Sequence, residues 1–318
     1  MDLDFTEEHD MLREMVRGVC EQYAPLATVR ALENDPKGYP DELWGQLVEL
    51  GLVGILIPES HGGQGQTLLE AAIVYEEFGR ALAPVPHFVS AVLAAGALID
   101  AGSDAQKSEW LPRIAAGEAV LTPAWLEPRN GYGPKGVQLR AIADAGDFVL
   151  SGSKLHVVFA KSADRLIVLA RTGDGEGEID LFLVDPRRSG VTISQRQNLG
   201  SESLFRVDFE DVRISASDRI GAARSGWSIW DRVMHDGIVL SAAQAAGGAA
   251  RALEMTVAYA KEREQFGKPL GAFQSISHYL ADSATAIEGG TTLVYEAAWR
   301  RSVGKPSRRL APLAKLFM

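Results

Sequence analysis

Cysteine and long hydrophobic runs are the two features that the sequence most clearly lacks. The single cysteine among 318 residues, Cys20, excludes an intramolecular disulfide and any zinc or iron–sulfur site that needs several cysteines. No segment reaches the roughly 18 consecutive apolar residues of a membrane-spanning helix. The chain starts with acidic residues, where a secretory signal would be basic. We therefore expect a cytoplasmic protein with no membrane span.

Histidine is sparse as well, and basic residues are outnumbered. The six histidines are scattered with no pair at metal-ligand spacing, so no metal site is expected. The 32 basic and 42 acidic residues give a net charge of −10, which argues against nucleic-acid binding. Hydrophobic residues make up 46% and charged residues 23%, so we expect a globular chain of two or three domains.

The first 120 residues have the periodicity of helices. Predicted helices begin after Thr6, at Asp41 and near Leu68, and another carries residues 109–111. The glycine-rich stretch at residues 61–65 can either cradle a phosphate before a helix or form a tight turn, and we favour the turn.

The middle of the chain, residues 121–222, changes to short β-rich segments between glycine, aspartate and proline turns. Short strands without long helices between them predict an antiparallel sheet or a small barrel. The predicted strands cover residues 139–143, 148–150, 165–170, 179–184, 191–194 and 204–209.

Helical periodicity returns at about residue 225. One long helix is predicted to end near Gly267, and a second spans residues 273–303 with an interruption at residues 289–290. A third begins near Leu310 and stops with the sequence at Met318. The predicted fold is therefore α+β and multidomain. It has an N-terminal helical domain (1–120), a middle antiparallel β-barrel-like domain (121–222) and an incomplete C-terminal helical bundle (223–318).

The segment at residues 263–274, REQFGKPLGAFQ, carries the most informative pattern. It places an arginine and two glutamines at a corner between two helices. Such a corner can bind a diphosphate through the arginine fork and the free N–H groups of a helix start. The alternative is a well-capped helical hairpin with solvated charges, and the chemistry alone favours this second interpretation.

Residues 263–274 also resemble the R-x-x-F-G-x-x-[IL]-x-x-[FH]-Q signature of the acyl-CoA dehydrogenases. Other stretches agree with this resemblance in the same order along the chain. Residues 58–65 resemble the family's P-x-x-x-G-G-x-G turn, and residues 127–128 its E-P flavin loop. Residues 150–154 resemble its L-x-G-x-K hairpin, and residues 164–171 fit the following strand.

The resemblance implies a fold, a cofactor and a reaction. The family has a helical domain, a β-domain and a four-helix bundle, with FAD between the last two, and its subunits form dimers of dimers. Its members dehydrogenate a CoA thioester at Cα and Cβ. A carboxylate takes the α-proton, the β-hydrogen leaves as hydride to the flavin, and the electrons pass to an electron-transfer flavoprotein. Hydrogen bonds to the thioester carbonyl stabilise the enolate.

Site residues are carried over from the resemblance. The positions that contact the FAD of the neighbouring subunit in the family are Arg263, Gln265, Phe266, Phe273 and Gln274.

In the chain's own flavin loop, Glu127, His156 and Val158 stand at cofactor-binding positions. Leu126 and Val158 replace threonines that would donate hydrogen bonds.

The resemblance leaves the catalytic base undetermined. Most members carry a glutamate near the C-terminus, which would lie past Met318. Others carry one on the first long helix of the bundle, where this chain has Gly237, so the adjacent Asp236 is the candidate.

Two functions follow from these observations. The first is an FAD-dependent acyl-CoA dehydrogenase of fatty-acid or steroid degradation that works as a homo- or hetero-oligomer. The second is a non-catalytic partner subunit that completes the flavin site of a catalytic chain. A related flavin oxidase or monooxygenase is a third reading that no motif supports.

Overall fold

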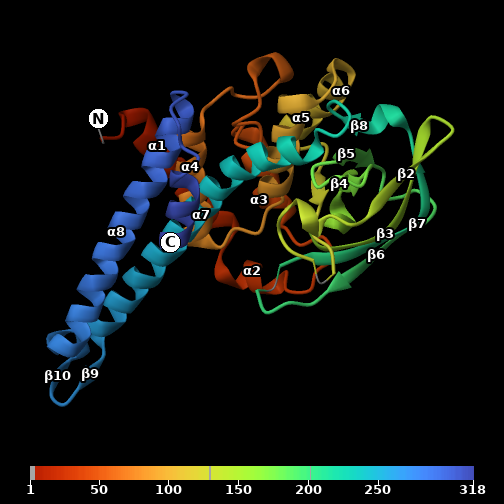
Figure 1. The fold of residues 1–318 in the computed structure, drawn as a ribbon. Helices are drawn as coiled ribbons and strands as arrows, with labels where there is room; N and C mark the ends of the chain where they lie inside the picture. The colour runs from red at the N-terminus through yellow and green to blue at the C-terminus, as the bar shows by residue number, and fades with distance from the viewer. Residues whose placement is uncertain (1–3, 129, 201) are drawn as a thin grey trace. The chain divides into compact units, whose positions relative to one another are not determined.

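The computed structural model describes residues 4–128, 130–200 and 202–318, and these form two compact units (Figure 1). The first unit contains residues 4–26, 67–83 and 235–318, and the second contains residues 27–66 and 84–234. Helices precede and follow a single large sheet along the chain, which confirms the predicted α+β class and element order.

The first unit is helical. Its helices are α1 (Glu7–Tyr23), α4 (Leu68–Ala81), α7 (Gly226–Glu262) from residue 235 onward, α8 (Gln274–Ser302) and α9 (Leu310–Phe317). The predicted cap is confirmed, because the Thr6 side chain accepts a hydrogen bond from the His9 N–H. Helix α4 packs against both α1 and α8, and α9 packs against α8.

Glycines allow α4 and α7 to touch through their backbones. A Cβ atom at Gly79 would lie 1.9 Å from the carbonyl oxygen of Gln244, and one at Gly247 would lie 1.8 Å from that of Glu76. Since neither neighbour is a flexible side chain, larger residues would force the helices apart. These contacts explain the small residues that the sequence shows along α7.

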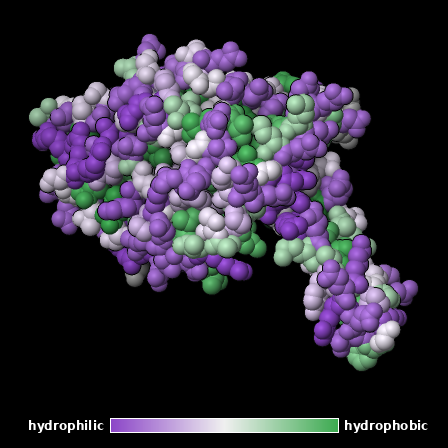
Figure 2. All heavy atoms as spheres, turned by 180° about the vertical axis from the view of Figure 1, so that it is seen from behind, coloured by the Kyte–Doolittle hydropathy of each residue, from purple (hydrophilic) through white to green (hydrophobic). Residues whose placement is uncertain are grey.

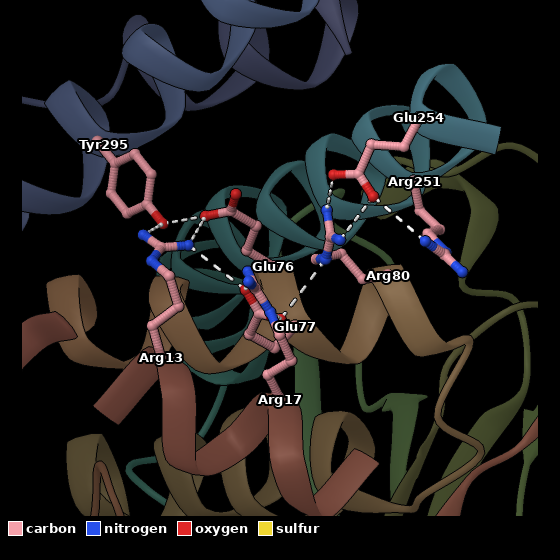
Figure 3. Close-up of polar contacts among 8 residues, drawn as sticks. All are labelled: Arg13, Arg17, Glu76, Glu77, Arg80, Arg251, Glu254 and Tyr295. Carbon is pink, nitrogen blue, oxygen red and sulfur yellow. Dashed lines mark hydrogen bonds and ion pairs between the residues drawn. The ribbon is translucent and has the colours of Figure 1, made fainter. Parts of the chain in front are cut away.

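A polar network then joins α1, α4, α7 and α8 (Figure 3). The buried Glu77 carboxylate lies 2.8 Å from the Arg17 guanidinium and within 3.6 Å of Arg80. Arg80 in turn forms two 2.8 Å hydrogen bonds to Glu254 on α7. Several arginines share the cost of burying the acids, so the network fixes the packing of the helices. Its members are Arg13, Arg17, Glu76, Glu77, Arg80, Arg251, Glu254 and Tyr295.

The predicted interruption of α8 at residues 289–290 is wrong, because the helix continues unbroken through both glycines. Helix α9 explains why glycine is needed there. A Cβ atom at Gly290 would lie 2.1 Å from the Met318 sulfur and 3.1 Å from the Phe317 ring. Gly290 therefore leaves room for Phe317 and Met318 at the end of α9.

The second unit begins with short helices that support the sheet. They are α2 (Leu26–Ala31), α3 (Asp41–Glu49), a π-helical segment (Phe88–Ala94), α5 (Ala95–Ala101) and α6 (Asp104–Ala115). The glycine-rich residues 61–65 form the predicted tight turn. Gly62 and Gly65 have φ of +80° and +61°, and the Gln64 N–H donates to the Gly54 carbonyl at 2.9 Å. The backbone donors of this turn bond within the chain.

One sheet makes up the middle of the second unit, in the order β6-β7-β3-β2-β4-β5-β8 with β1 beside β4. Its buried face carries large apolar side chains such as Phe182 and Phe205. The strands are β1 (Leu121–Ala124), β2 (Arg140–Asp144), β3 (Asp147–Val158), β4 (Arg165–Arg171), β5 (Ile179–Val184), β6 (Val191–Arg196), β7 (Leu204–Ile214) and β8 (Arg219–Ile220).

The prediction of a purely antiparallel sheet is wrong at β4, which pairs in parallel with β1 and, at one position, with β2. The connection at residues 159–164 reverses the chain once, so β4 runs opposite to β3 and parallel to β2. Strand β1 was not predicted, because its four residues are all buried and show no alternation. Among the described residues, no helix combines the length and hydropathy needed to cross a membrane.

Candidate functional site

The loop at residues 125–139 leaves β1 and is held in place by a buried ion pair. Lys154 Nζ on β3 lies 2.6 Å from Glu127 Oε1. The Glu127 carboxylate also accepts hydrogen bonds from the backbone N–H groups of Gln138 and Leu139, both at 2.9 Å. Glu127 therefore connects the start of the loop to its end and to the sheet.

Burial disfavours the charged form of Lys154. Desolvation lowers the pKa of this fully buried amine to about 8, although the negative charge of Glu127 and the hydrogen bond to it act in the opposite direction. The Trp125 carbonyl oxygen is a further acceptor, at 3.4 Å. The loop therefore depends on a lysine whose charge is costly to bury.

Arg171, at the end of β4, holds the far end of the same loop. Its buried guanidinium donates to the carbonyls of Pro134 at 2.9 Å, Val137 at 3.0 Å and Gly175 at 2.6 Å. Sequence reasoning missed this residue. The available signal was an arginine that ends a continuous apolar strand, where a charged side chain needs several acceptors.

His156 lies on an irregular segment of β3 next to this loop. The register of β3 against β7 shifts between Lys154 and Val157. His156 adopts φ of +52° there and is exposed. The Leu155 N–H donates to the Leu126 carbonyl at 2.8 Å, which ties the loop to this bulge. A left-handed histidine at a bulge is strained backbone that redirects a side chain.

Val158, the last predicted residue of this group, ends β3. Its carbonyl accepts a 2.7 Å hydrogen bond from the buried Thr122 hydroxyl on β1. The structure therefore places Glu127, His156 and Val158 along one stretch of β3 and the loop bonded to it. Leu126 and Val158 present no side-chain donor there.

The second predicted group lies in the first unit, where α7 and α8 run side by side to a short hairpin (Figure 1). The prediction that α7 extends to Gly267 is wrong, since it ends at Glu262. Strand β9 (Glu264–Gln265) pairs with β10 (Lys268–Pro269). Phe266 and Gly267 between them have φ of +54° and +79°, as a two-residue hairpin turn requires.

The hairpin exposes an unusual aromatic side chain. Phe266 is 92% exposed, and its ring centroid lies 6.3 Å from that of Phe273. Lys268 Nζ sits 4.3 Å from the Phe273 centroid. Figure 2 shows hydrophobic atoms at the surface of this end among hydrophilic ones. Arg263, Gln265 and Gln274 are also exposed at this hairpin, so all five residues predicted for this group lie together.

Asp236, the candidate base, has a strong partner. Its two carboxylate oxygens accept hydrogen bonds from the Arg301 guanidinium at 2.7 Å and 3.0 Å, which joins α7 to α8. A carboxylate held in this way would have to leave the arginine before it could take a proton from a substrate.

The two groups suit different parts of a nucleotide cofactor. The middle of the loop at residues 125–139 carries the exposed Gly131 and Gly133, and the backbone N–H groups of residues 131–133 can donate to a diphosphate. In the described part of the chain, no carboxylate pairs with the Arg263 guanidinium. An exposed arginine without an ion-pair partner, in a protein of net charge −10, suits a phosphate.

Three family models match successive parts of the chain. The model for "Acyl-CoA dehydrogenase, N-terminal domain" matches residues 6–118, that for the middle domain matches residues 123–212, and that for the C-terminal domain matches residues 224–318.

Individual relatives and a solved structure agree with this match. The probable acyl-CoA dehydrogenase YngJ of Bacillus subtilis is 33% identical over 327 residues, which cover 100% of this chain and 85% of that protein. Subunit CarC of the caffeyl-CoA reductase–Etf complex of Acetobacterium woodii is 31% identical over 321 residues, covering 98% of this chain and 84% of CarC. A chain in the ChsE4–ChsE5 complex from Mycobacterium tuberculosis matches with a TM-score of 0.89 at 29% identity, covering 100% of this chain and 84% of the other.

The chain therefore belongs to the acyl-CoA dehydrogenase family and is an FAD-dependent oxidoreductase that acts on the CH–CH bond of a CoA thioester.

Proposed function

We propose that the chain binds FAD with two segments that come from different copies. The loop at residues 125–139 and the bulge of β3 form one part, through Glu127, His156 and Val158. The hairpin of a second copy forms the other part, through Arg263, Gln265, Phe266, Phe273 and Gln274. The observation that carries this proposal is the exposed hairpin, where Arg263 has no carboxylate partner among the described residues and Phe266 has almost no packing.

The residues present fit this cofactor in distinct ways. Glu127 acts indirectly, because its carboxylate is bound to Lys154 and two backbone N–H groups. It fixes the loop whose exposed N–H groups at residues 131–133 meet the diphosphate. His156 supplies an exposed ring beside the Leu126 backbone. Bound FAD supplies the hydride acceptor for the reaction.

The protein's remaining task is to orient the thioester and to receive its α-proton. We propose that Asp236 serves mainly to join α7 and α8 through Arg301, because both of its oxygens are engaged.

A second candidate function is that of a partner subunit in a heteromeric enzyme. Leu126 and Val158 offer no side-chain donor in the chain's own loop, whereas the hairpin carries a full set of polar and aromatic residues. The similarity to a chain of the two-component ChsE4–ChsE5 complex supports this candidate.

We further propose an oligomer that passes electrons to an electron-transfer flavoprotein in the cytoplasm during lipid or steroid degradation. The relative named as part of a complex with such a flavoprotein supports the electron acceptor. CoA thioesters are intracellular metabolites, which supports the location.

Flavin content tests the proposal. The purified chain should carry FAD by absorbance, and Arg263→Ala should lower the FAD retained per chain by about tenfold, as expected for a lost charged hydrogen bond. Arg251→Ala is the matched control, because it removes an arginine from α7, the helix that leads to Arg263, at a position where the acidic Glu254 already binds the guanidinium. Equal FAD retention in the Arg263 variant and the wild type would contradict the role of the hairpin. A chain that is colourless alone and yellow only with a second subunit would favour the partner function.

A further inference from the structure

Arg171, the last residue of β4, carries a buried positive charge that no carboxylate neutralises. The residue is 6% exposed. Its guanidinium donates to the backbone carbonyl oxygens of four residues, Pro134, Val137, Gly175 and Glu176. Among the residues that the structure describes, no carboxylate oxygen lies within ion-pair distance of it. Burying a guanidinium costs free energy even when its hydrogen bonds are satisfied, so folding alone gives little reason for a cation here.

Two of these carbonyls belong to a tight turn in the candidate cofactor loop and to the residue after it. Residues Pro134–Gly136 form a short 3₁₀ turn, in which the Gly136 N–H donates to the Gly133 carbonyl at 2.8 Å. Arg171 donates to the carbonyl of Pro134, which starts the turn, at 2.9 Å, and to that of Val137, directly after it, at 3.0 Å. Because one planar guanidinium makes both bonds, it fixes the orientation of the turn.

The turn lies against the exposed segment that meets the diphosphate in the proposed function. A Cβ atom at Gly136 would lie 1.8 Å from the Gly131 carbonyl oxygen, so the two backbones are in contact. A Cβ atom at Gly131 or at Gly133 would meet nothing within 4 Å, so this backbone is open to a ligand. The start of the segment is held by Glu127, which accepts a 3.2 Å hydrogen bond from the Asn130 side chain. The segment is therefore open on its outer side and held at both ends.

The charge of Arg171 remains available to attract an anion at this segment. The neighbouring loop at residues 172–178, to which Arg171 bonds through the Gly175 carbonyl, is acidic. Its three acidic side chains each pair with a separate cation, in the pairs Asp174–Arg140, Glu176–Lys135 and Glu178–Arg224. Carbonyl dipoles stabilise a guanidinium without cancelling its net charge, so Arg171 still contributes a positive potential.

We infer that Arg171 is a positioning residue for the diphosphate of the bound cofactor. Its guanidinium holds the turn at residues 134–136, and the turn holds the backbone of residues 131–133 in the shape that receives the diphosphate. Its net charge favours the anion there. A backbone that is held in its binding shape before the ligand arrives pays no ordering cost on binding. This inference rests on the proposed function, because the diphosphate belongs to FAD.

The experiment compares Arg171→Lys with the wild-type full chain, both stripped of flavin. Lysine keeps the charge but cannot reproduce the several hydrogen bonds of the planar guanidinium. Arg140→Lys is the matched control, because it makes the same exchange at an exposed arginine of the neighbouring strand β2 that binds Asp174. Dissociation constants are measured for FAD, ADP and riboflavin. ADP carries the diphosphate without the flavin ring, and riboflavin carries the ring without the diphosphate.

Arg171→Lys should weaken the binding of FAD and ADP by about tenfold and change that of riboflavin by less than about twofold. Arg140→Lys should leave all three unchanged. An equal loss for riboflavin would show a general structural role and overturn the inference, as would unchanged affinities for FAD and ADP. Arg171→Met removes the charge as well and should weaken FAD and ADP further, and a loss no larger than that of Arg171→Lys would overturn the role of the charge.

Gly136→Ala disturbs the same turn without changing Arg171, and it tests the inference if Arg171→Lys does not fold. It should show the same pattern of losses. The double variant should lose no more than the weaker-binding single variant, because both changes act through one turn, and fully additive losses would overturn the inference. This comparison needs only FAD and ADP, so it decides the matter even where riboflavin binds too weakly to measure. A wild-type chain that binds neither FAD nor ADP would instead contradict the proposed function and remove the ligand that the inference requires.

Discussion

Lys154 Nζ on β3 lies 2.6 Å from Glu127 Oε1 on the candidate cofactor loop, with the lysine fully buried and the glutamate 6% exposed. This pair connects the sheet to both ends of the loop, because the same carboxylate accepts the N–H groups of Gln138 and Leu139. The family's E-P and L-x-G-x-K motifs thus meet in space, although the sequence resemblance identified them separately, as a flavin loop and a hairpin.

Removing one member of this pair should be costly. Lys154→Met leaves a buried carboxylate without its cation and should lower the free energy of unfolding by about 3–5 kcal/mol. The double variant Glu127→Gln/Lys154→Met removes the charge but keeps an oxygen for the two N–H groups, so it should be more stable than the single variant. Urea unfolding of both variants checks this, with the exposed Lys161→Met as control. A single variant as stable as the wild type would contradict the anchoring role.

Because Lys154 is buried, the free energy of unfolding should also depend on pH in the alkaline range. The pKa of Lys154 in the folded chain is about 8, against an ordinary value of 10.5. Between these values the unfolded chain keeps a proton that the folded chain has lost, so the Lys154 contribution to the free energy of unfolding rises with pH. Cys20, whose pKa burial raises to about 12, has the opposite effect above its ordinary value of 9.0. Cys20 is present in both the wild type and Lys154→Met, so its contribution cancels in the difference between their free energies of unfolding. That difference should increase from pH 8 to about 10.5. A flat difference would contradict the burial of a charged lysine.

Acid stability should depend on His87. Burial lowers its pKa to about 4, and its Nε2 lies 3.0 Å from the Leu52 carbonyl oxygen. The unfolded chain binds a proton near the ordinary value of 6.5, before the folded chain does. Stability is therefore lost as pH falls from 6.5 to 4, by about 3 kcal/mol. His87→Gln keeps a donor and does not titrate, so its stability should fall less over this range in urea titrations. Parallel pH curves for the two proteins would show that His87 takes up a proton as readily in the folded chain as in the unfolded chain, which would contradict the lowered pKa.

Substitution of Asp236 tests whether this residue is the catalytic base. If its main role is the ion pair with Arg301, Asp236→Asn should lower stability by less than about 1 kcal/mol, as for partly exposed pairs. Turnover should stay within about threefold of the wild type, whereas loss of a general base costs about 10²–10⁴-fold. Arg301→Ala should have a similar small effect on stability. A thousandfold loss of turnover in Asp236→Asn alone would establish the residue as the base.

The sequence predicted the starts of the helices at Thr6, where the side-chain cap is present, and at Asp41, where acidic residues open the first turn. It failed where tertiary contacts override local signals. Gly289 and Gly290 suggest a break in a helix, but α8 continues through both, and the packing of Phe317 and Met318 favours a small residue at position 290. The parallel pairing of β1 with β4 depends on how the chain reverses between strands, and the hydrophobic periodicity of the sequence does not show strand direction.

For the site as well, residues that are close in sequence were predicted, and a residue brought in by tertiary contacts was missed. The five hairpin residues are close in sequence, and a motif of fixed spacing was enough to group them. Arg171 lies far along the chain from the loop that it contacts and belongs to no short motif. Its role depends on the backbone carbonyls that the fold brings around its guanidinium, and the sequence does not show them.

The most direct test of the account is anaerobic titration of the purified, FAD-loaded chain with acyl-CoA thioesters, followed by the flavin absorbance bands. The account predicts that a CoA thioester bleaches the oxidised flavin band of the wild-type chain and that Arg263→Ala, with less bound FAD, shows a proportionally smaller change. A chain that binds stoichiometric FAD yet shows no bleaching with straight-chain, aromatic or steroid CoA esters would contradict it.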